Sequence, residues 1–152
     1  MRKSLFAAAF ALLATASPLR ASGEGLSLAP VPYTLTLPQA VGRHLSTGPL
    51  TGAFAEEVQQ AGATAATLVF YQPENGEKTI LMSVYYVPAG KFDAAQKPDE
   101  PPMFGQEVLR SEGMVLSVAG PLDTIYEPGT PDGENVIAAN GLIYAPQSYT
   151  PK

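Results

Sequence analysis

Residues 67–87, TLVFYQPENGEKTILMSVYYV, limit the fold more than any other part of the chain. Two runs rich in β-branched and aromatic residues flank Asn75-Gly76, a pair that favours a two-residue hairpin turn because both residues tolerate positive φ. The pairs that such a turn places opposite each other are Tyr71 with Ile80, Val69 with Met82 and Thr67 with Val84. The sequence therefore predicts an antiparallel hairpin in this register.

Both faces of the predicted hairpin are apolar. The first face carries Val69, Tyr71, Ile80, Met82, Val84 and Tyr86, and the second carries Leu68, Phe70, Leu81, Tyr85 and Val87. A monomer rarely leaves so large an apolar patch in water, so we expect the second face to be covered as well. We favour a buried second face. The alternative is an open groove in which Phe70 and Tyr85 are aromatic anchors.

The first residues are typical of an export signal. A basic start at residues 1–3 precedes an uncharged apolar run over 4–16, and small residues follow. We expect residues 1–21 to be a cleaved signal peptide, with cleavage after Ala16 or Ala21. The run is too short for a membrane anchor. The mature chain should therefore lie in the periplasm or be secreted, without stable membrane insertion.

Charge and cysteine content exclude several classes of function. Removal of Arg2, Lys3 and Arg20 with the signal leaves six basic residues against fourteen acidic ones, a balance that disfavours nucleic acid as a partner. The chain has no cysteine, so it has neither disulfides nor cysteine-based zinc ligands. We expect no cofactor and no metal.

Shorter patterns predict the remaining elements. We expect a flexible leader over 22–31 and a single globular domain over 32–152. Alternation of Tyr and Leu with Thr predicts a strand over 32–37. Further expected elements are a short strand at 43–46, helices at 53–61, 91–95 and 131–140, and a second hairpin over 106–110 and 114–119. Thr130 suits the N-cap of the last helix, and Gly141 suits a left-handed C-cap. The expected strands and helices together predict an α+β fold: a single antiparallel sheet of four to six strands flanked by short helices.

No complete catalytic or metal-binding set is present in the sequence. His44 is the only histidine, and no G-x-S-x-G elbow accompanies it. The acidic residues near the last helix lack the order of a calcium loop; they are Asp123, Glu127, Asp132 and Glu134. A polar surface histidine and helix-capping acids are the simpler interpretations.

The order of the elements resembles a known group. YTLTLP opens the domain, VYYVPAGKFDA ends the apolar hairpin, and EVLRSEGMVLSVAGPLDTIYEP precedes the last helix. Over most of residues 32–144 this order resembles small exported bacterial proteins of unknown function and, at fold level, the PsbP-like sandwich. The resemblance implies an antiparallel sheet flanked by helices and no functional residues.

Two functions follow as hypotheses. The first is an exported, non-enzymatic accessory protein that binds a protein or an apolar small molecule through one sheet face or the 88–105 loop. Its candidate ligand-binding residues are Phe70, Tyr85, Phe92 and Phe104. The second is a small extracytoplasmic hydrolase that uses His44 with a carboxylate.

Overall fold

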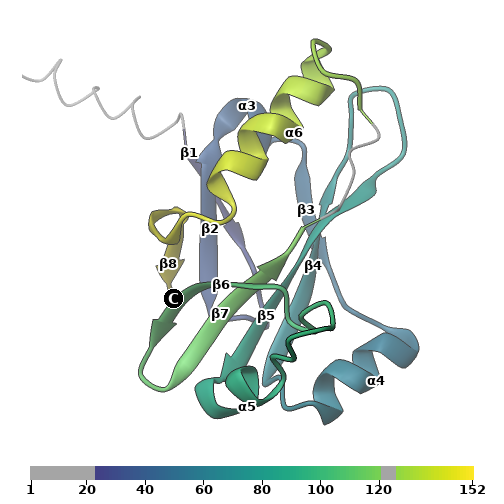
Figure 1. Ribbon diagram of the computed structural model, residues 1–152. Coiled ribbons are helices and arrows are strands. Elements are labelled where there is room, and N and C mark those ends of the chain that lie inside the picture. The colour runs from purple at the N-terminus through teal and green to yellow at the C-terminus, as the bar shows by residue number, and fades with distance from the viewer. Residues whose placement is uncertain (1–22, 121–125) are drawn as a thin grey trace, which may run out of the picture.

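The computed structural model describes residues 23–120 and 126–152, and this part of the chain forms two antiparallel sheets (Figure 1). A three-stranded sheet has the order β1 (Gly23–Ser27), β2 (Tyr33–Pro38), β8 (Tyr149–Pro151). A five-stranded sheet has the order β3 (Leu45–Gly48), β4 (Ala65–Tyr71), β5 (Thr79–Pro88), β7 (Met114–Ala119), β6 (Gln106–Ser111). The helices are α3 (Gln39–Gly42), α4 (Gly52–Gln60), α5 (Ala89–Ala94), α6 (Pro131–Leu142) and the 3₁₀ turn η1 (Pro146–Ser148).

The α+β class and the antiparallel pairing are confirmed, but the expected single sheet is wrong. The second sheet arises because residues 23–31, which we expected to belong to a flexible leader, are part of the fold. Gly23–Ser27 pairs along β2, and Leu28 and Val31 are completely buried beside it. On the other side of β2, Leu35 lies opposite Tyr149. Burial of these apolar side chains offsets the entropy lost on ordering both ends of the domain.

The predicted hairpin exists, but its register is correct only away from the turn. Val69 lies opposite Met82 as expected, whereas a bulge after Val69 places Tyr71 opposite Thr79. Tyr71 is 1% exposed and Ile80 is 53% exposed, so the two point to opposite sides of the sheet and the predicted pair is wrong. The bulge also accounts for the burial of the adjacent Leu81 and Met82 in the same core.

The connection between β4 and β5 is longer than a two-residue turn. The strands stop at Tyr71 and Thr79, so residues 72–78 form the loop. Neither Asn75 nor Gly76 has positive φ. A Cβ atom on Gly76 would lie 2.8 Å from Cγ of Pro73, so the glycine is required by packing against the proline ring. The type I′ geometry occurs instead in the second hairpin, at Glu112 (φ 52°) and Gly113 (φ 79°).

Two apolar cores lie on the two faces of the five-stranded sheet. The larger core fills the space between the two sheets and under α3 and α6; its strand residues include Leu35, Val69, Val84 and Val118. The smaller core, on the outer face, is built from Val58 of α4, Phe92 of α5, Phe104, Tyr85, Val87 and Val115. In Figure 1, α6 lies at one end of the molecule and α4 and α5 lie at the other.

The last helix begins as predicted and ends later. The Thr130 hydroxyl oxygen accepts a hydrogen bond from the Gly133 amide at 3.1 Å, which confirms the N-cap. The helix continues through Gly141 to Leu142, so the left-handed cap expected at Gly141 is wrong. The reason is burial of the next residue: Ile143 is completely buried, and its amide still donates to the Ala139 carbonyl.

The expected signal segment, residues 1–21, lies outside the described residues. Within 23–120 and 126–152, no helix has both the length and the apolar character needed to span a membrane.

Candidate functional site

Three of the four predicted ligand-binding residues lie together inside the protein. Tyr85, Phe92 and Phe104 are each less than 5% exposed and belong to the outer-face core. The Tyr85 and Phe104 rings meet edge to face with centroids 5.6 Å apart, and Phe92 stacks on Phe104 at 6.4 Å. The 88–105 segment therefore folds back over β5, so its aromatic residues contribute to the core. Their role in binding a ligand stays a prediction.

Phe70 lies apart from the other three. It is half-buried on β4, and the Lys78 ammonium stands 4.8 Å from its ring centroid, within the range of a cation–π contact. A Cβ atom on Gly48 would lie 2.8 Å from the Phe70 ring, so the ring covers the backbone of β3. The structure does not bring the four predicted residues into one site.

His44 is held by its neighbours at the start of β3. Its Nδ1 lies 2.8 Å from the Gln72 carbonyl oxygen, which can only accept, so Nδ1 carries a proton. The imidazole ring stacks on Tyr71 with centroids 5.0 Å apart. Within the described ranges, His44 forms no ion pair with a carboxylate. The Asp132 carboxylate instead accepts a hydrogen bond from the Tyr71 hydroxyl at 2.7 Å, and no contact seen here favours the hydrolase hypothesis.

The acidic residues near α6 have structural partners. Asp132 binds Tyr71, and Glu134 Oε2 accepts a hydrogen bond from the Gly129 amide at 3.1 Å. Asp123 lies outside the described residues. In the two described ranges, no three His, Asp or Glu side chains lie close enough together to hold a metal ion.

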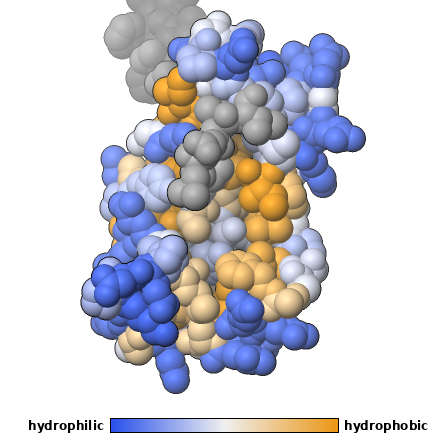
Figure 2. Space-filling model, turned by 45° about the vertical axis from the view of Figure 1, so that its right-hand side comes forward, coloured by the Kyte–Doolittle hydropathy of each residue, from blue (hydrophilic) through white to orange (hydrophobic). Residues whose placement is uncertain are grey.

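A candidate site is a groove of about 440 Å³ between α4, α5 and the loop after α5. We call it the α4–α5 groove. Its lining residues are Phe54, Ala61, Lys91, Ala94, Ala95, Lys97, Glu100, Pro101 and Met103. Figure 2 shows the most apolar side chains away from the lower end of the molecule; that end, where Figure 1 places α4 and α5, mixes hydrophilic and weakly apolar side chains. A volume of this size falls in the range of small-molecule sites.

Two structural features keep the groove open. The walls carry the small residues Ala61, Ala94 and Ala95, which leave space where larger side chains would meet. Phe54 remains 44% exposed, although its partner on the same helix, Val58, is buried as the helical pattern predicts. An aromatic side chain that is held at the edge of an apolar groove can contact a ligand without rearrangement.

Comparisons with known proteins give no guide to the ligand. No protein-family model, curated protein or solved structure matches this chain. The resemblance to the PsbP-like sandwich therefore stays a prediction. The proposal for function below is based on the geometry of the groove.

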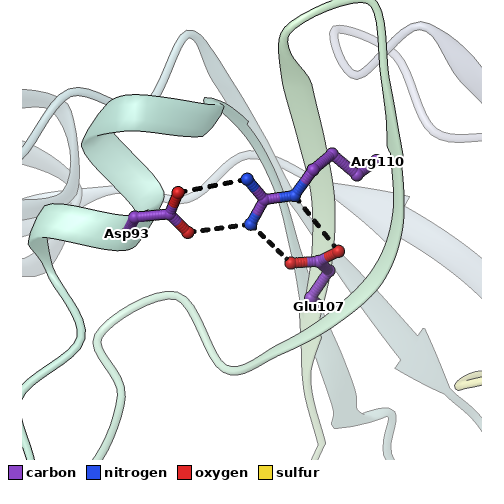
Figure 3. A network of polar contacts seen from close by, with 3 residues as sticks. All are labelled: Asp93, Glu107 and Arg110. Carbon is purple, nitrogen blue, oxygen red and sulfur yellow. Dashed lines mark hydrogen bonds and ion pairs between the residues drawn. The ribbon is translucent and has the colours of Figure 1, made fainter.

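A polar network fixes the wall of the groove that α5 provides (Figure 3). The Arg110 guanidinium on β6 donates two hydrogen bonds to the Asp93 carboxylate on α5, at 2.8 and 3.1 Å. It donates two more to Glu107, at 2.7 and 3.3 Å. These hydrogen bonds lower the pKa of Asp93 below its ordinary value. On the opposite side of α5, Phe92 enters the core, so the helix is held at both faces.

Sequence reasoning missed the groove because its residues are inconspicuous. Phe54 was assigned to the apolar face of its helix, and the alanines of 89–95 carried no distinct signal. The predicted helical turn at 91–95 corresponds to α5, but the stretch after it, predicted as an exposed loop, buries Phe104. Periodicity does not tell which helix such a stretch lies against. The available clue was the number of small residues near both helices, Ala61, Gly62 and Ala63 on one side and Ala94 and Ala95 on the other.

Proposed function

We propose that this protein is an exported, non-enzymatic binding protein that holds an apolar small molecule in the α4–α5 groove. The observation that carries the proposal is the groove itself, about 440 Å³, whose mixed lining includes the apolar side chains of Met103 and the part-exposed Phe54 beside Lys91, Lys97 and Glu100. Its α5 wall is held by the buried Phe92 and by the Arg110–Asp93 contact, so the apolar surface is formed before any ligand arrives. Preformed sites lose less conformational entropy when they bind.

The apolar residues of the groove would supply most of the affinity. Covering Phe54 and Met103 with a ligand removes apolar surface from water, which stabilises a complex by roughly 25 cal/mol for each Å². No nucleophile–base pair is needed for such a role. Export is supported by the basic start and apolar run of residues 1–16.

A neutral fluorescent probe tests this function. N-phenyl-1-naphthylamine brightens in apolar sites and should bind the purified protein. Phe54→Ala should weaken binding about three- to tenfold because one apolar wall is lost, and Ala94→Phe should weaken it by filling the groove. The control is Ile137→Ala, since Ile137 is 50% exposed but lies on α6, away from the groove. Equal binding by all four proteins would refute the assignment.

Export has its own test. The chain, expressed in a bacterium with its natural start, should be recovered outside the cytoplasm with a new N-terminus at Ser17 or Ser22, as read by mass spectrometry. Both cuts leave β1, which begins at Gly23, intact. Recovery of the unprocessed chain from the cytoplasm would contradict this part of the proposal.

A further inference from the structure

Lys91 of α5 lines the α4–α5 groove and is exposed. Its aliphatic stem crosses Gly62, the second residue after the end of α4. A Cβ atom on Gly62 would lie 2.7 Å from Cγ and 2.9 Å from Cδ of Lys91, so this crossing requires a glycine. Gly62 also has a φ of +112°, which favours glycine for a second reason. The stem is therefore confined between the two helices that form the groove.

The Lys91 ammonium has no polar partner within the described part of the chain. The other described basic side chains each have a partner: Arg43 pairs with Glu74, Lys97 with Glu100, Arg110 with Asp93 and Lys152 with Ser27, and Lys78 lies over the Phe70 ring. Asp93, the acid nearest to Lys91 in sequence, binds Arg110 of β6, as Figure 3 shows.

The charges that line the groove do not cancel. Glu100 is the only acid among the lining residues, and it lies 3.7 Å from the Lys97 ammonium. Glu56 and Glu57 of α4 are not part of the lining. The lining residues therefore carry a net charge of +1 beside apolar side chains, in a protein whose net charge is −5. The exposed Lys91 ammonium next to an apolar surface favours a ligand with one negative charge.

We propose that the ligand is a medium-chain aliphatic carboxylate. This inference rests on the proposed binding function and names its ligand class. The alkyl chain would lie against Phe54, Ala61 and Met103, and the carboxylate would pair with Lys91. A single lysine matches a monoanion; a phosphate dianion is usually met by several donors or by an arginine fork, and no arginine lines this groove.

Competition between two ten-carbon molecules tests the assignment. Decanoate and decan-1-ol have the same alkyl chain and differ in charge. At low ionic strength, decanoate should displace N-phenyl-1-naphthylamine at about a three- to tenfold lower concentration than decan-1-ol. Lys91→Met, which keeps an unbranched stem over Gly62 without the charge, should abolish this difference. The control Lys78→Met should retain it, because Lys78 lies outside the groove.

The outcomes separate the two proposals. Equal displacement by decanoate and decan-1-ol, displacement by neither, or a preference that survives Lys91→Met would overturn the carboxylate assignment while the groove remains a binding site. The binding function would be refuted, and the carboxylate assignment with it, if the probe did not bind or if Phe54→Ala and Ala94→Phe left its affinity unchanged. Circular dichroism of Lys91→Met confirms that the variant is folded.

Discussion

Two glycines of α6, Gly133 and Gly141, differ in the space around them. A Cβ atom on Gly133 would lie 2.0 Å from the Glu127 carbonyl oxygen, whereas a Cβ atom on Gly141 would meet nothing within 4 Å. We expect Gly133→Ala to lower the free energy of unfolding by about 1–3 kcal/mol through overpacking. Gly141→Ala should raise it by roughly 0.5–1 kcal/mol, because alanine favours the helix. Urea unfolding of both variants checks this; equal effects would contradict the close approach at Gly133.

The Tyr71 hydroxyl joins β4 to α6. It donates to Asp132 and accepts from the Asn135 side-chain amide at 3.0 Å. The pKa of Tyr71 is raised to about 12, chiefly by burial; the hydrogen bond from Asn135 lowers it and the hydrogen bond to Asp132 raises it. Because the folded pKa exceeds the ordinary value of 10.0, this contribution to stability is complete below pH 10 and is lost as the pH rises through 12.

Tyr71→Phe should therefore act in two ways. At pH 7 it should cost about 1–2 kcal/mol, because Asp132 and Asn135 lose their partner. Between pH 10 and 12 the free energy of unfolding should fall less steeply than in the wild type. Part of the fall should persist, because burial also raises the pKa of Tyr149. Urea titrations across this pH range measure both effects, with Tyr86→Phe as the control; an unchanged slope would contradict the role of Tyr71.

At the scale of elements, the turns of the two hairpins differ from what their residues predict. Asn75-Gly76 has the stronger type I′ preference, yet the left-handed turn is formed by Glu112-Gly113. Glu112→Asn should stabilise the protein by roughly 0.5–1 kcal/mol, because asparagine tolerates positive φ better than glutamate. Asn75→Ala should change stability little. Thermal unfolding compares the two variants, and a loss of stability in Glu112→Asn would contradict the turn assignment.

Elements with a strong period were predictable from sequence, and their arrangement was not. The alternation of Tyr33, Leu35 and Leu37 with threonines identified β2, and the pattern of residues 67–87 identified the central hairpin. β1 was not predicted, because GEGLS contains two glycines and no alternation of apolar and polar residues. Only its pairing with β2 defines it as a strand. The packing beside the candidate site was not predicted for a related reason. Phe104 packs against Tyr85 and Phe92 packs against Phe104, and local sequence does not encode these contacts.

At the scale of the whole molecule, residues 149–151 complete the smaller sheet. Tyr149 is 5% exposed, packs in the core between the sheets, and donates a hydrogen bond to the Ile143 carbonyl. Tyr149→Ala should lower the free energy of unfolding by about 3–5 kcal/mol, through the cavity and the unpaired carbonyl that it leaves. The exposed neighbour Thr150→Ala should stay within about 0.5 kcal/mol. Equal values in denaturant unfolding would show that β8 contributes little.

The pairing of β2 with β8 also sets an order of events during synthesis. β2 lies near the start of the domain, and one of its two neighbours is made more than a hundred residues later. A ribosome that delivers the chain from its N-terminus therefore leaves one edge of β2 unpaired until residue 151 has emerged. Such distant pairing slows folding. For an exported protein, as proposed above, late closure of this sheet would keep the chain unfolded for longer before it reaches a translocation channel. A chain that ends before residue 149 would keep one edge of β2 unpaired.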